Sequence, residues 1–497
     1  MDGSWDDVGC RAAHGAASDL RPAARGRGKN PATAAAPAGG RPRATARKGA
    51  AADAALPRAR RADYLPAATA GGGRPASLAA REQPPGDRPS IALVDRPAPH
   101  TVTDPLLRFR DEFPILARTT YLVSNSLGAM PRATRERLAG YADAWDELGV
   151  RAWAEGWWEM PQRVGDEIAP LLGAGPGEVA MLPNVSMAQA AVVSALDYPP
   201  ERDTIVTTEL DFPSVRYVYD GLGSRLGARV VAVPSDDGIT IDTQRLLAAI
   251  DERTRLVAVS HVLFRSAFIM DAEAICRRAR EVGALVSLDA YHAVGVIPVD
   301  VTALGVDFYA GGVLKWLCGG PGGAFLYVRP ELGETLRPAV TGWQAHTRPF
   351  AFEPAMESAP GIQRWLGGTP AIPALYAAVE GPRLLRAAGV DAVRAKSVRQ
   401  TARLAELAEA RGHTLRAPRD PARRGGTVAF DVAHGYEVAQ YLLARDVIVD
   451  YRPNAGIRVA PHFYTSDGEL EAAVALIDEA LETGGWRAYG SRRSVVT

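Results

Sequence analysis

Cysteine is scarce in this sequence. The chain has 497 residues but only three cysteines, Cys10, Cys276 and Cys318. An odd number of cysteines without a regular spacing predicts neither a disulfide framework nor a zinc site. We therefore expect no bound metal and a reducing compartment, the cytoplasm.

Long apolar runs and a net charge are also missing. No run approaches the ~20 apolar residues that a membrane-spanning helix needs, and the N-terminus lacks the apolar core of a secretory signal. Lys and Arg together number 57, as do Asp and Glu, so the formal net charge is +0. We expect no membrane partner, and the balanced charge says nothing further about partners.

Lysine is the scarcest charged residue. Only Lys29, Lys48, Lys315 and Lys396 occur, so the remaining 53 of the 57 basic residues are arginine (57 − 4). Arginine cannot form an imine, whereas a desolvated lysine can. Lys315 lies in an apolar stretch, where a solvated lysine would be unusual. At this point it is either a catalytic lysine or a lysine that is ion-paired or extends to solvent.

Residues 1–103 are dominated by Ala, Arg, Gly and Pro and show almost no apolar periodicity. Such a stretch cannot bury enough surface to offset the entropy of ordering it, so we predict a disordered extension or translation from an upstream start codon. A basic arm that contacts nucleic acid is the alternative. Interspersed acids and few aromatic residues weaken that alternative, and we expect no nucleic-acid partner.

From Asp104 onward, β-rich runs alternate with helical patterns. Strands are predicted at 204–207, 229–233, 256–260, 284–288, 307–310 and 323–328, with helices between them such as 243–250 and 271–282. This alternation predicts a largely parallel sheet covered by helices on both faces. After about residue 360 a smaller α+β segment is predicted, with strands at 426–432 and 447–451 and helices at 436–445 and 467–482. The expected domains are 104–355 and 356–497.

Polar residues follow the predicted strands. Ser260 ends one strand, Asp289 ends the next, and Lys315 lies in the loop between the two strands after that. Ligands of open α/β sheets bind beyond the carboxyl ends of the strands. An aspartate that keeps a pyridine nitrogen protonated and a lysine that forms an imine are what a pyridoxal phosphate (PLP) site requires. The alternative for Asp289 is a helix N-cap.

Four further residues have two interpretations each. His292 either faces the same cofactor or is a capped or surface histidine. Ser186 precedes an apolar helical run and could cradle a phosphate at the helix terminus or cap the helix, and these two roles are compatible. Phe212 either stacks on a ring or belongs to the core. Arg458, alone in an apolar run, pairs with a substrate carboxylate or with an internal acid.

Several segments together resemble the fold-type I PLP enzymes of the class V aminotransferase group, and kynureninase in particular. The resemblance runs from about Tyr121 to Tyr464. The matching stretches are Asn125-Ser126-Leu127-Gly128, Phe212-Pro213-Ser214, Asp289-Ala290-Tyr291-His292, Lys315-Trp316-Leu317, Gly319-Gly320-Pro321-Gly322, Gly342-Trp343, Gly368-Thr369-Pro370 and Asp450-Tyr451-Arg452.

The resemblance implies a large domain with a mostly parallel seven-stranded sheet between helices, and a smaller C-terminal α+β domain. It implies that Lys315 forms the imine with PLP, that Asp289 contacts the pyridine nitrogen, and that His292 lies near the phenolic oxygen. Phe212 would stack on the ring. The other implied cofactor-binding positions are Val185, Ser186, Pro213, Ser214, Ser260, Trp343 and Thr369.

The resemblance also implies a substrate and a partner. Arg458 would hold the carboxylate of an amino-acid substrate, and Asn125 would also contact the substrate. Trp343 and Thr369 would reach the phosphate of the neighbouring subunit's cofactor, so a homodimer with shared active sites is expected. The reaction of the family is hydrolysis of the Cβ–Cγ bond of kynurenine or 3-hydroxykynurenine, which gives an anthranilate-type product and alanine.

Departures from the family pattern fall in the site. Leu314 stands where kynureninases carry a tyrosine that contacts the phosphate and has been assigned an acid role, and Val215 replaces an aspartate. Other departures are Leu263, Ser266-Ala267 and Gln344-Ala345. Transamination, epimerisation or β-elimination on another amino acid therefore stays an alternative reaction. A catalytically silent PLP-fold binding protein is a third hypothesis.

Overall fold

The computed structural model describes residues 104–490, all of which belong to one compact unit by their contacts. The extension predicted for residues 1–103 lies outside the described residues. The expected domain boundary between residues 355 and 356 stays a prediction. Within residues 104–490, no helix has both the length and the apolar character needed to cross a bilayer.

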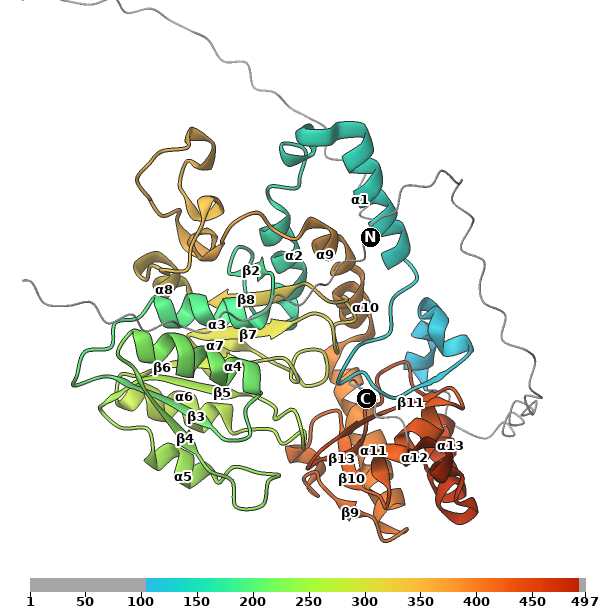
Figure 1. Ribbon diagram of the computed structural model, residues 1–497. Helices are drawn as coiled ribbons and strands as arrows, with labels where there is room; N and C mark the ends of the chain where they lie inside the picture. The colour runs from blue at the N-terminus through green and yellow to red at the C-terminus, as the bar shows by residue number, and fades with distance from the viewer. Residues whose placement is uncertain (1–103, 491–497) are drawn as a thin grey trace, which may run out of the picture. The chain divides into compact units, whose positions relative to one another are not determined.

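A seven-stranded sheet dominates the first part of the described chain (Figure 1). Its order is β2-β8-β7-β6-β5-β3-β4, and every neighbouring pair is parallel except the two pairs that β8 makes. The strands are β2 (Val179–Leu182), β3 (Thr204–Thr208), β4 (Arg229–Val233), β5 (Thr254–Ser260), β6 (Leu285–Asp289), β7 (Phe308–Gly312) and β8 (Ala324–Val328). The predicted mostly parallel sheet is confirmed.

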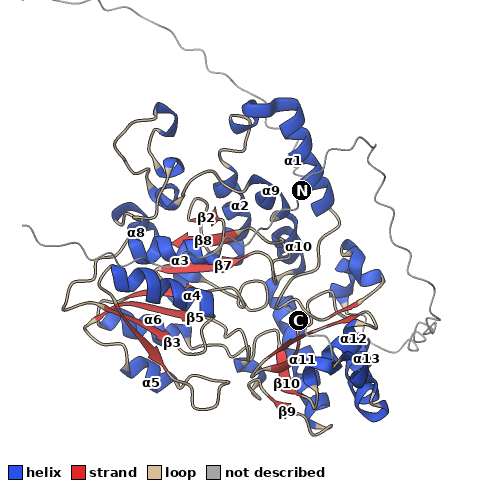
Figure 2. Cartoon of the chain, viewed as in Figure 1, coloured by secondary structure: helices blue, strands red, loops and turns tan. Residues whose placement is uncertain are grey.

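Helices cover both faces of this sheet (Figure 2). They are α2 (Met160–Ile168), α3 (Val185–Ser194), α4 (Pro213–Val218), α5 (Thr243–Ala248), α6 (Ala272–Glu281), α7 (Val301–Leu304), α8 (Pro330–Thr335), α9 (Ile372–Ala377) and α10 (Glu380–Ala388). Along β5, Val257 and Val259 belong to one apolar cluster, whereas Leu256 and Ala258 belong to another. Because successive side chains of a strand point to opposite faces, these two clusters are the cores above and below the sheet.

A second, antiparallel sheet lies in the C-terminal part, in the order β12-β13-β10-β9. Its strands are β9 (Thr414–Leu415), β10 (Val428–Asp431), β12 (Asp450–Arg452) and β13 (Gly456–Val459). With α11 (Val390–Glu409), α12 (Gly435–Leu443) and α13 (Asp467–Thr483), this sheet surrounds a separate apolar core.

The single strand predicted at 447–451 was wrong, because the chain forms two strands there. Strand β11 (Val447–Ile448) pairs in parallel with β1 (Thr120–Tyr121), while β12 joins the second sheet. The chain changes sheets at Val449, which is fully buried. The apolar pattern of a sequence does not show where a strand leaves one sheet and joins another.

The segment after β1 carries residues from near the start of the described chain into the middle of the molecule. Val123 bridges to Ala460, and the backbone N–H of Gly128 donates to the carbonyl of Leu314 at 2.8 Å. A side chain at Gly128 would overlap the carbonyl oxygen of Lys315, so only glycine permits this close approach. The segment ahead of helix α1 (Thr134–Leu148) is therefore packed directly on the lysine loop.

Lys396, the second lysine among residues 104–490, fixes the start of the described chain. Lys396 on α11 lies with its Nζ 2.8 Å from a carboxylate oxygen of Asp104, and it donates to the carbonyl of Phe463 at 2.7 Å. Its side chain is almost fully buried. Lys396 is thus an ion-paired structural lysine, which leaves Lys315 as the lysine of different character.

Candidate active site

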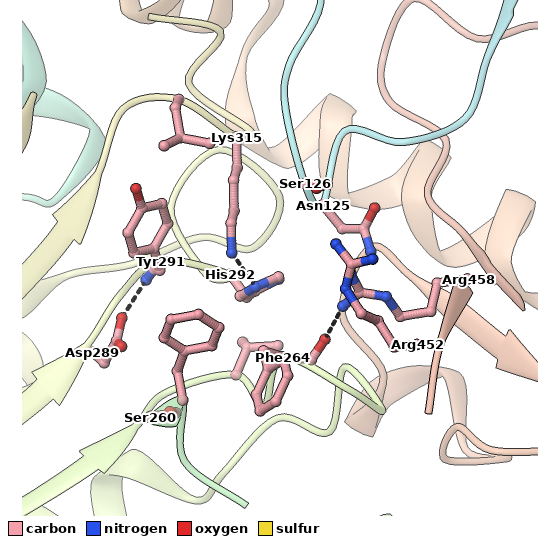
Figure 3. A pocket seen from close by; sticks show the side chains of 13 residues that line it. Asn125, Ser126, Ser260, Phe264, Asp289, Tyr291, His292, Lys315, Arg452 and Arg458 are labelled. Atoms are coloured by element: carbon pink, nitrogen blue, oxygen red, sulfur yellow. Dashed lines mark hydrogen bonds between the residues drawn. The ribbon is translucent and has the colours of Figure 1, made fainter. Parts of the chain in front are cut away.

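A cavity of about 290 Å³ lies beyond the carboxyl ends of β5 and β6, beside the loop that follows β7 (Figure 3). This is the position that open α/β sheets use for ligands. Its lining residues are Asn125, Ser126, Phe212, Ser260, Val262, Phe264, Asp289, Tyr291, His292, Leu314, Lys315, Arg452 and Arg458.

The amine of Lys315 points into this cavity, and its Nζ lies 2.7 Å from Nε2 of His292 (Figure 3). Burial lowers the pKa of Lys315, and the nearby guanidinium of Arg458 lowers it further. A neutral amine is the form that attacks a carbonyl carbon, so the pocket prepares Lys315 for imine formation. His292 is buried at 5% exposure, and burial and the neighbouring Lys315 lower its pKa as well. It is therefore not a surface histidine.

Asp289 ends β6, directly opposite Ser260 in the register of β5. Its carboxylate accepts the backbone N–H of Tyr291 at 2.9 Å, and the structure records no other donor to it within residues 104–490. Burial raises the pKa of Asp289, although the Tyr291 N–H and Lys315 act in the opposite direction. No helix begins at Asp289, so the N-cap alternative is wrong. A buried carboxylate of this kind is suited to a cationic partner.

Two aromatic rings flank the lysine amine. Lys315 Nζ is 4.4 Å from the ring centroid of Tyr291 and 5.7 Å from that of Phe212. Phe212 is 41% exposed and packs edge-on against Phe264 with their centroids 5.1 Å apart, so it belongs to the cavity wall and not to the core. Flat walls of this kind match a planar aromatic ligand.

A buried aspartate next to Phe212 ties two strand ends together. Asp211 accepts from the backbone N–H of Ser260 at 2.7 Å through one oxygen. Its other oxygen accepts from Thr207 Oγ1 and from the backbone N–H and Oγ1 of Thr208, at 2.7–3.0 Å. Charge-assisted hydrogen bonds of this kind hold the ends of β3 and β5 in fixed positions beside the cavity.

Arg458 on β13 reaches the cavity from the second sheet. Its Nε donates to a carboxylate oxygen of Asp450 at 2.8 Å, its Nη2 contacts the other oxygen, and its Nη1 donates to the carbonyl of Phe264 at 2.7 Å. The internal acid that was one alternative for Arg458 is therefore present. Arg452 also lies 3.3 Å from Asp450, so two cations share one carboxylate and one positive charge remains for an anionic ligand.

Asn125 enters from the segment after β1 and is fully buried. Neither its amide oxygen nor its amide nitrogen has a hydrogen-bond partner among the described residues. Buried polar groups without partners are rare and costly in native structures, so this amide is suited to a polar ligand in the cavity. Asn125 lines the cavity, and its predicted contact with the substrate stays a prediction.

Val185 and Ser186 begin helix α3 but do not line this cavity. The N-cap is Asn184, whose side chain accepts the backbone N–H of Met187 at 3.0 Å, so the alternative of Ser186 as the cap is wrong. The Ser186 hydroxyl has no hydrogen bond recorded within residues 104–490. A helix N-terminus with a nearby hydroxyl fits a phosphate. Pro213 and Ser214 begin α4 and also lie outside the lining.

Trp343 and Thr369 are not brought to the lysine cavity within one chain. Trp343 packs against Trp158, Phe350 and Phe352, with ring centroids 4.9, 5.6 and 6.1 Å apart. Thr369 lines a separate hollow of about 80 Å³. Their roles in binding a neighbouring subunit's cofactor stay predictions.

The residues present fit pyridoxal phosphate. Lys315 has an amine whose lowered pKa favours the neutral form needed for covalent attachment, and Asp289 is a buried carboxylate with room for a pyridinium N–H donor. Phe212 offers a flat wall, and the N-terminus of α3 offers amides for the phosphate. Within the described ranges no group of His, Cys, Asp and Glu residues is arranged to hold a metal ion.

Comparison with known proteins agrees with this geometry. Residues 143–465 match the family model described as Aminotransferase class-V. A kynureninase of Burkholderia pseudomallei (strain 1106a) is 34% identical over 411 residues, which cover 79% of this chain and 97% of that protein. A kynureninase of Pseudomonas fluorescens is 34% identical over 400 residues, with 77% and 94% covered.

Two solved structures share the fold. The cysteine desulfurase of Thermococcus onnurineus NA1 superposes with a TM-score of 0.67 at 22% identity, covering 76% of this chain and 98% of its own. A mutant of C-DES with glycine covalently linked to its PLP cofactor superposes with a TM-score of 0.68 at 22% identity, covering 74% and 99%.

The fold and the site thus define a PLP-dependent enzyme of the class V aminotransferase group. Within that group, the chain belongs to the kynureninase family. The resemblance, the fold class and the cofactor predicted from the sequence are confirmed.

Some lining residues were not predicted as site residues from the sequence. Tyr291 lies between two predicted residues, Asp289 and His292, in one of the stretches that match the family, but no role was predicted for it. Phe264 and Arg452 come from a loop and from the second sheet, and no strand-end rule points to them. Asp450 appeared only in a matching motif, although it is the partner of Arg458.

Proposed function

We propose that the protein hydrolyses the Cβ–Cγ bond of kynurenine or 3-hydroxykynurenine, releasing an anthranilate-type product and alanine. The observation that carries this proposal is the cavity in which Lys315, His292, Asp289 and Arg458 meet. The similarity to kynureninases along 97% of the length of the Burkholderia pseudomallei protein supports it.

Bound PLP supplies an electron sink for carbanion chemistry at the substrate. The chain supplies the rest. Lys315 holds the cofactor and, once released from it, accepts and returns a proton at Nζ, which His292 Nε2 contacts at 2.7 Å. Arg458, fixed by Asp450, orients the substrate carboxylate, and Asn125 offers an amide to its polar groups.

The apolar part of the cavity suits an aryl group. Val262, Phe264 and Leu314 line it, and Val262 is 2% exposed. Burial of a benzene ring against such side chains favours binding by roughly 1.5–3 kcal/mol. The same residues that bind the ring also exclude water from the lysine amine.

Leu314 favours a second candidate reaction. Its side chain lines the cavity beside the lysine but has no group that can donate a proton. Transamination, epimerisation or β-elimination on another amino acid needs no acid at that position, and each starts from the same lysine and cofactor.

The experiment proceeds in two steps. The purified protein is titrated with PLP, its visible band is bleached with borohydride, and the label is mapped to Lys315. It is then incubated with kynurenine, 3-hydroxykynurenine and a panel of amino acids, with and without an α-keto acid. We expect fluorescent anthranilate release without the keto acid. Consumption that depends on the keto acid supports the second reaction, and a protein that takes up no PLP contradicts both.

We also propose a homodimer with shared sites in the cytoplasm. The aromatic side chains of Trp145, Phe350 and Phe352 are 61%, 57% and 74% exposed. Exposed apolar groups of this size favour burial against another copy. Cys276 and Cys318 are both buried and unpaired, which is consistent with a reducing compartment.

A further inference from the structure

A phenol faces the lysine cavity without a partner of its own. Tyr291 lies with its ring 4.4 Å from Lys315 Nζ, and no hydrogen bond joins its hydroxyl to any residue between 104 and 490. Figure 3 shows that this hydroxyl points away from Asp289. Tyr291 is half-buried. A bound ligand that covers its hydroxyl has to offer an acceptor, because a buried hydroxyl without one costs free energy.

The backbone is arranged to put the ring there. The Asp289 carboxylate accepts the backbone N–H of Tyr291, which fixes the turn after β6. On the opposite side, a side chain on Gly312 at the end of β7 would overlap Cζ and Oη of Tyr291. The phenolic end of the ring therefore lies over a glycine, two residues before Leu314.

Leu314 lacks the hydroxyl that the family has at this position. In the family pattern a tyrosine stands at this position and contacts the phosphate of the cofactor, whereas leucine cannot donate a hydrogen bond. Leu314 and Tyr291 both line the same cavity beside Lys315. The hydroxyl missing from one residue of this wall is thus present on another.

We propose that Tyr291 is a cofactor-binding residue whose hydroxyl donates a hydrogen bond to bound PLP, the contact that Leu314 cannot make. This inference rests on PLP binding as used in the proposed function. Burial raises the pKa of Tyr291, and the nearby Asp289 raises it further, so the phenol keeps its proton at neutral pH and can donate it to an anionic acceptor.

The test measures the affinity for PLP, not turnover. PLP is titrated into the wild-type protein and into Tyr291→Phe, and the visible band reports binding. We expect the variant to bind PLP roughly 10–150-fold more weakly, because a hydrogen bond to a charged group is lost while the ring is kept. Adding Leu314→Tyr to Tyr291→Phe restores a phenol to the same wall, and we expect it to recover most of the lost affinity.

Tyr441→Phe is the matched control. The hydroxyl of Tyr441 donates to Glu479 on the second sheet's helices, away from the lining of the cavity. This variant also loses one tyrosine hydrogen bond, and its PLP affinity is expected to equal that of the wild type.

Two outcomes overturn the inference. Equal affinity of the wild type and Tyr291→Phe shows that the hydroxyl does not contact the cofactor. Tighter binding by Tyr291→Ala shows that the ring obstructs the cofactor instead. Both require a wild-type protein that binds PLP, so they differ from failure of the proposed function, in which the wild type takes up none.

Discussion

Burial of Lys315 makes its pKa lower in the folded chain than in the unfolded chain. Its pKa is lowered from the ordinary value of 10.5 by burial and by Arg458. Between the lowered pKa and 10.5 the unfolded chain binds more protons, so the stability contributed at this residue rises with pH. At neutral pH, burying this amine therefore costs stability, which bound cofactor would restore.

Replacing this amine should stabilise the protein freed of cofactor. We expect Lys315→Met to raise the melting temperature at pH 7 by roughly 2–8 °C, with the gain shrinking toward pH 10.5. Thermal unfolding across pH 7–10.5 measures this. Lys396→Met is the control, and it should lower the melting temperature because it leaves the carboxylate of Asp104 without its lysine partner. A gain at Lys315 that does not vary with pH would contradict the explanation.

Ala267 has a backbone conformation that favours glycine. Its φ is +60°, in the loop that also holds Phe264, whose carbonyl accepts from Arg458. This backbone conformation destabilises the folded state by roughly 1–2 kcal/mol for alanine. Glycine removes that strain but stabilises the unfolded state by about 0.4–1 kcal/mol, because it gives the unfolded chain more conformational entropy. We therefore expect Ala267→Gly to stabilise the protein by roughly 0.5–1 kcal/mol in urea unfolding. Destabilisation would show that its methyl group, 2% exposed as part of the residue, contributes more by packing.

Individual site residues were predictable where a strand end or a rare residue type marked them. Lys315 was marked by the scarcity of lysine, and Asp289 and Ser260 by their strand ends. Arg458 was marked as a lone charge in an apolar strand, but its partner was not, because the pairing of β12 with β13 sets it opposite Asp450. A register between strands is decided by packing that a single sequence does not display.

At the scale of elements, the segment after β1 packs against the loop that holds Lys315, and Gly128 makes the closest contact between them. A Cβ on Gly128 would overlap the carbonyl oxygen of Lys315 and lie 2.8 Å from Cys318 Sγ. We expect Gly128→Ala to destabilise the protein by roughly 1–3 kcal/mol and to weaken PLP binding, as the loop must shift. Urea unfolding and PLP titration measure the two effects.

Gly140 provides the comparison for that variant. It lies within α1, and a Cβ there meets no atom within 4 Å. Gly140→Ala should therefore stabilise the helix by about 0.5–1 kcal/mol and leave PLP binding unchanged. If both glycine variants behaved alike, close packing at the lysine loop would not be the cause.

The elements were predicted better than their partners. Six of the seven strands of the large sheet were recognisable because each is a short apolar run bounded by helical patterns, whereas the four-residue strand β2 (Val179–Leu182) was not predicted. The division of 447–451 into β11 and β12 was not, because both pieces are apolar and only their different partners, β1 and β13, separate them.

At the scale of the whole molecule, the predicted sharing of sites can be tested with two defective chains. Lys315→Ala cannot attach the cofactor, and Thr369→Asp places a negative charge at the residue expected to face the neighbour's phosphate. Co-expressed, the two form hybrids in which one site has both native residues.

We expect borohydride-trapped PLP on Lys315 of the Thr369→Asp chain in the mixture, and little when that chain is expressed alone. Peptide mapping measures this label, and the mass of the native particle by light scattering gives the number of chains. Labelling of Thr369→Asp alone at the wild-type level would contradict sharing through this residue.

The pairing of Lys396 with Asp104 has a consequence for the reactivity of the protein. Between residues 104 and 490 it leaves Lys315 as the one side-chain amine that is not held in an ion pair. An aldehyde that reacts with this part of the chain will therefore be directed to the cavity, whichever aldehyde it is. Within residues 104–490, an aldehyde that forms an imine with lysine would therefore compete with the cofactor for Lys315, and its adduct there would inhibit the enzyme.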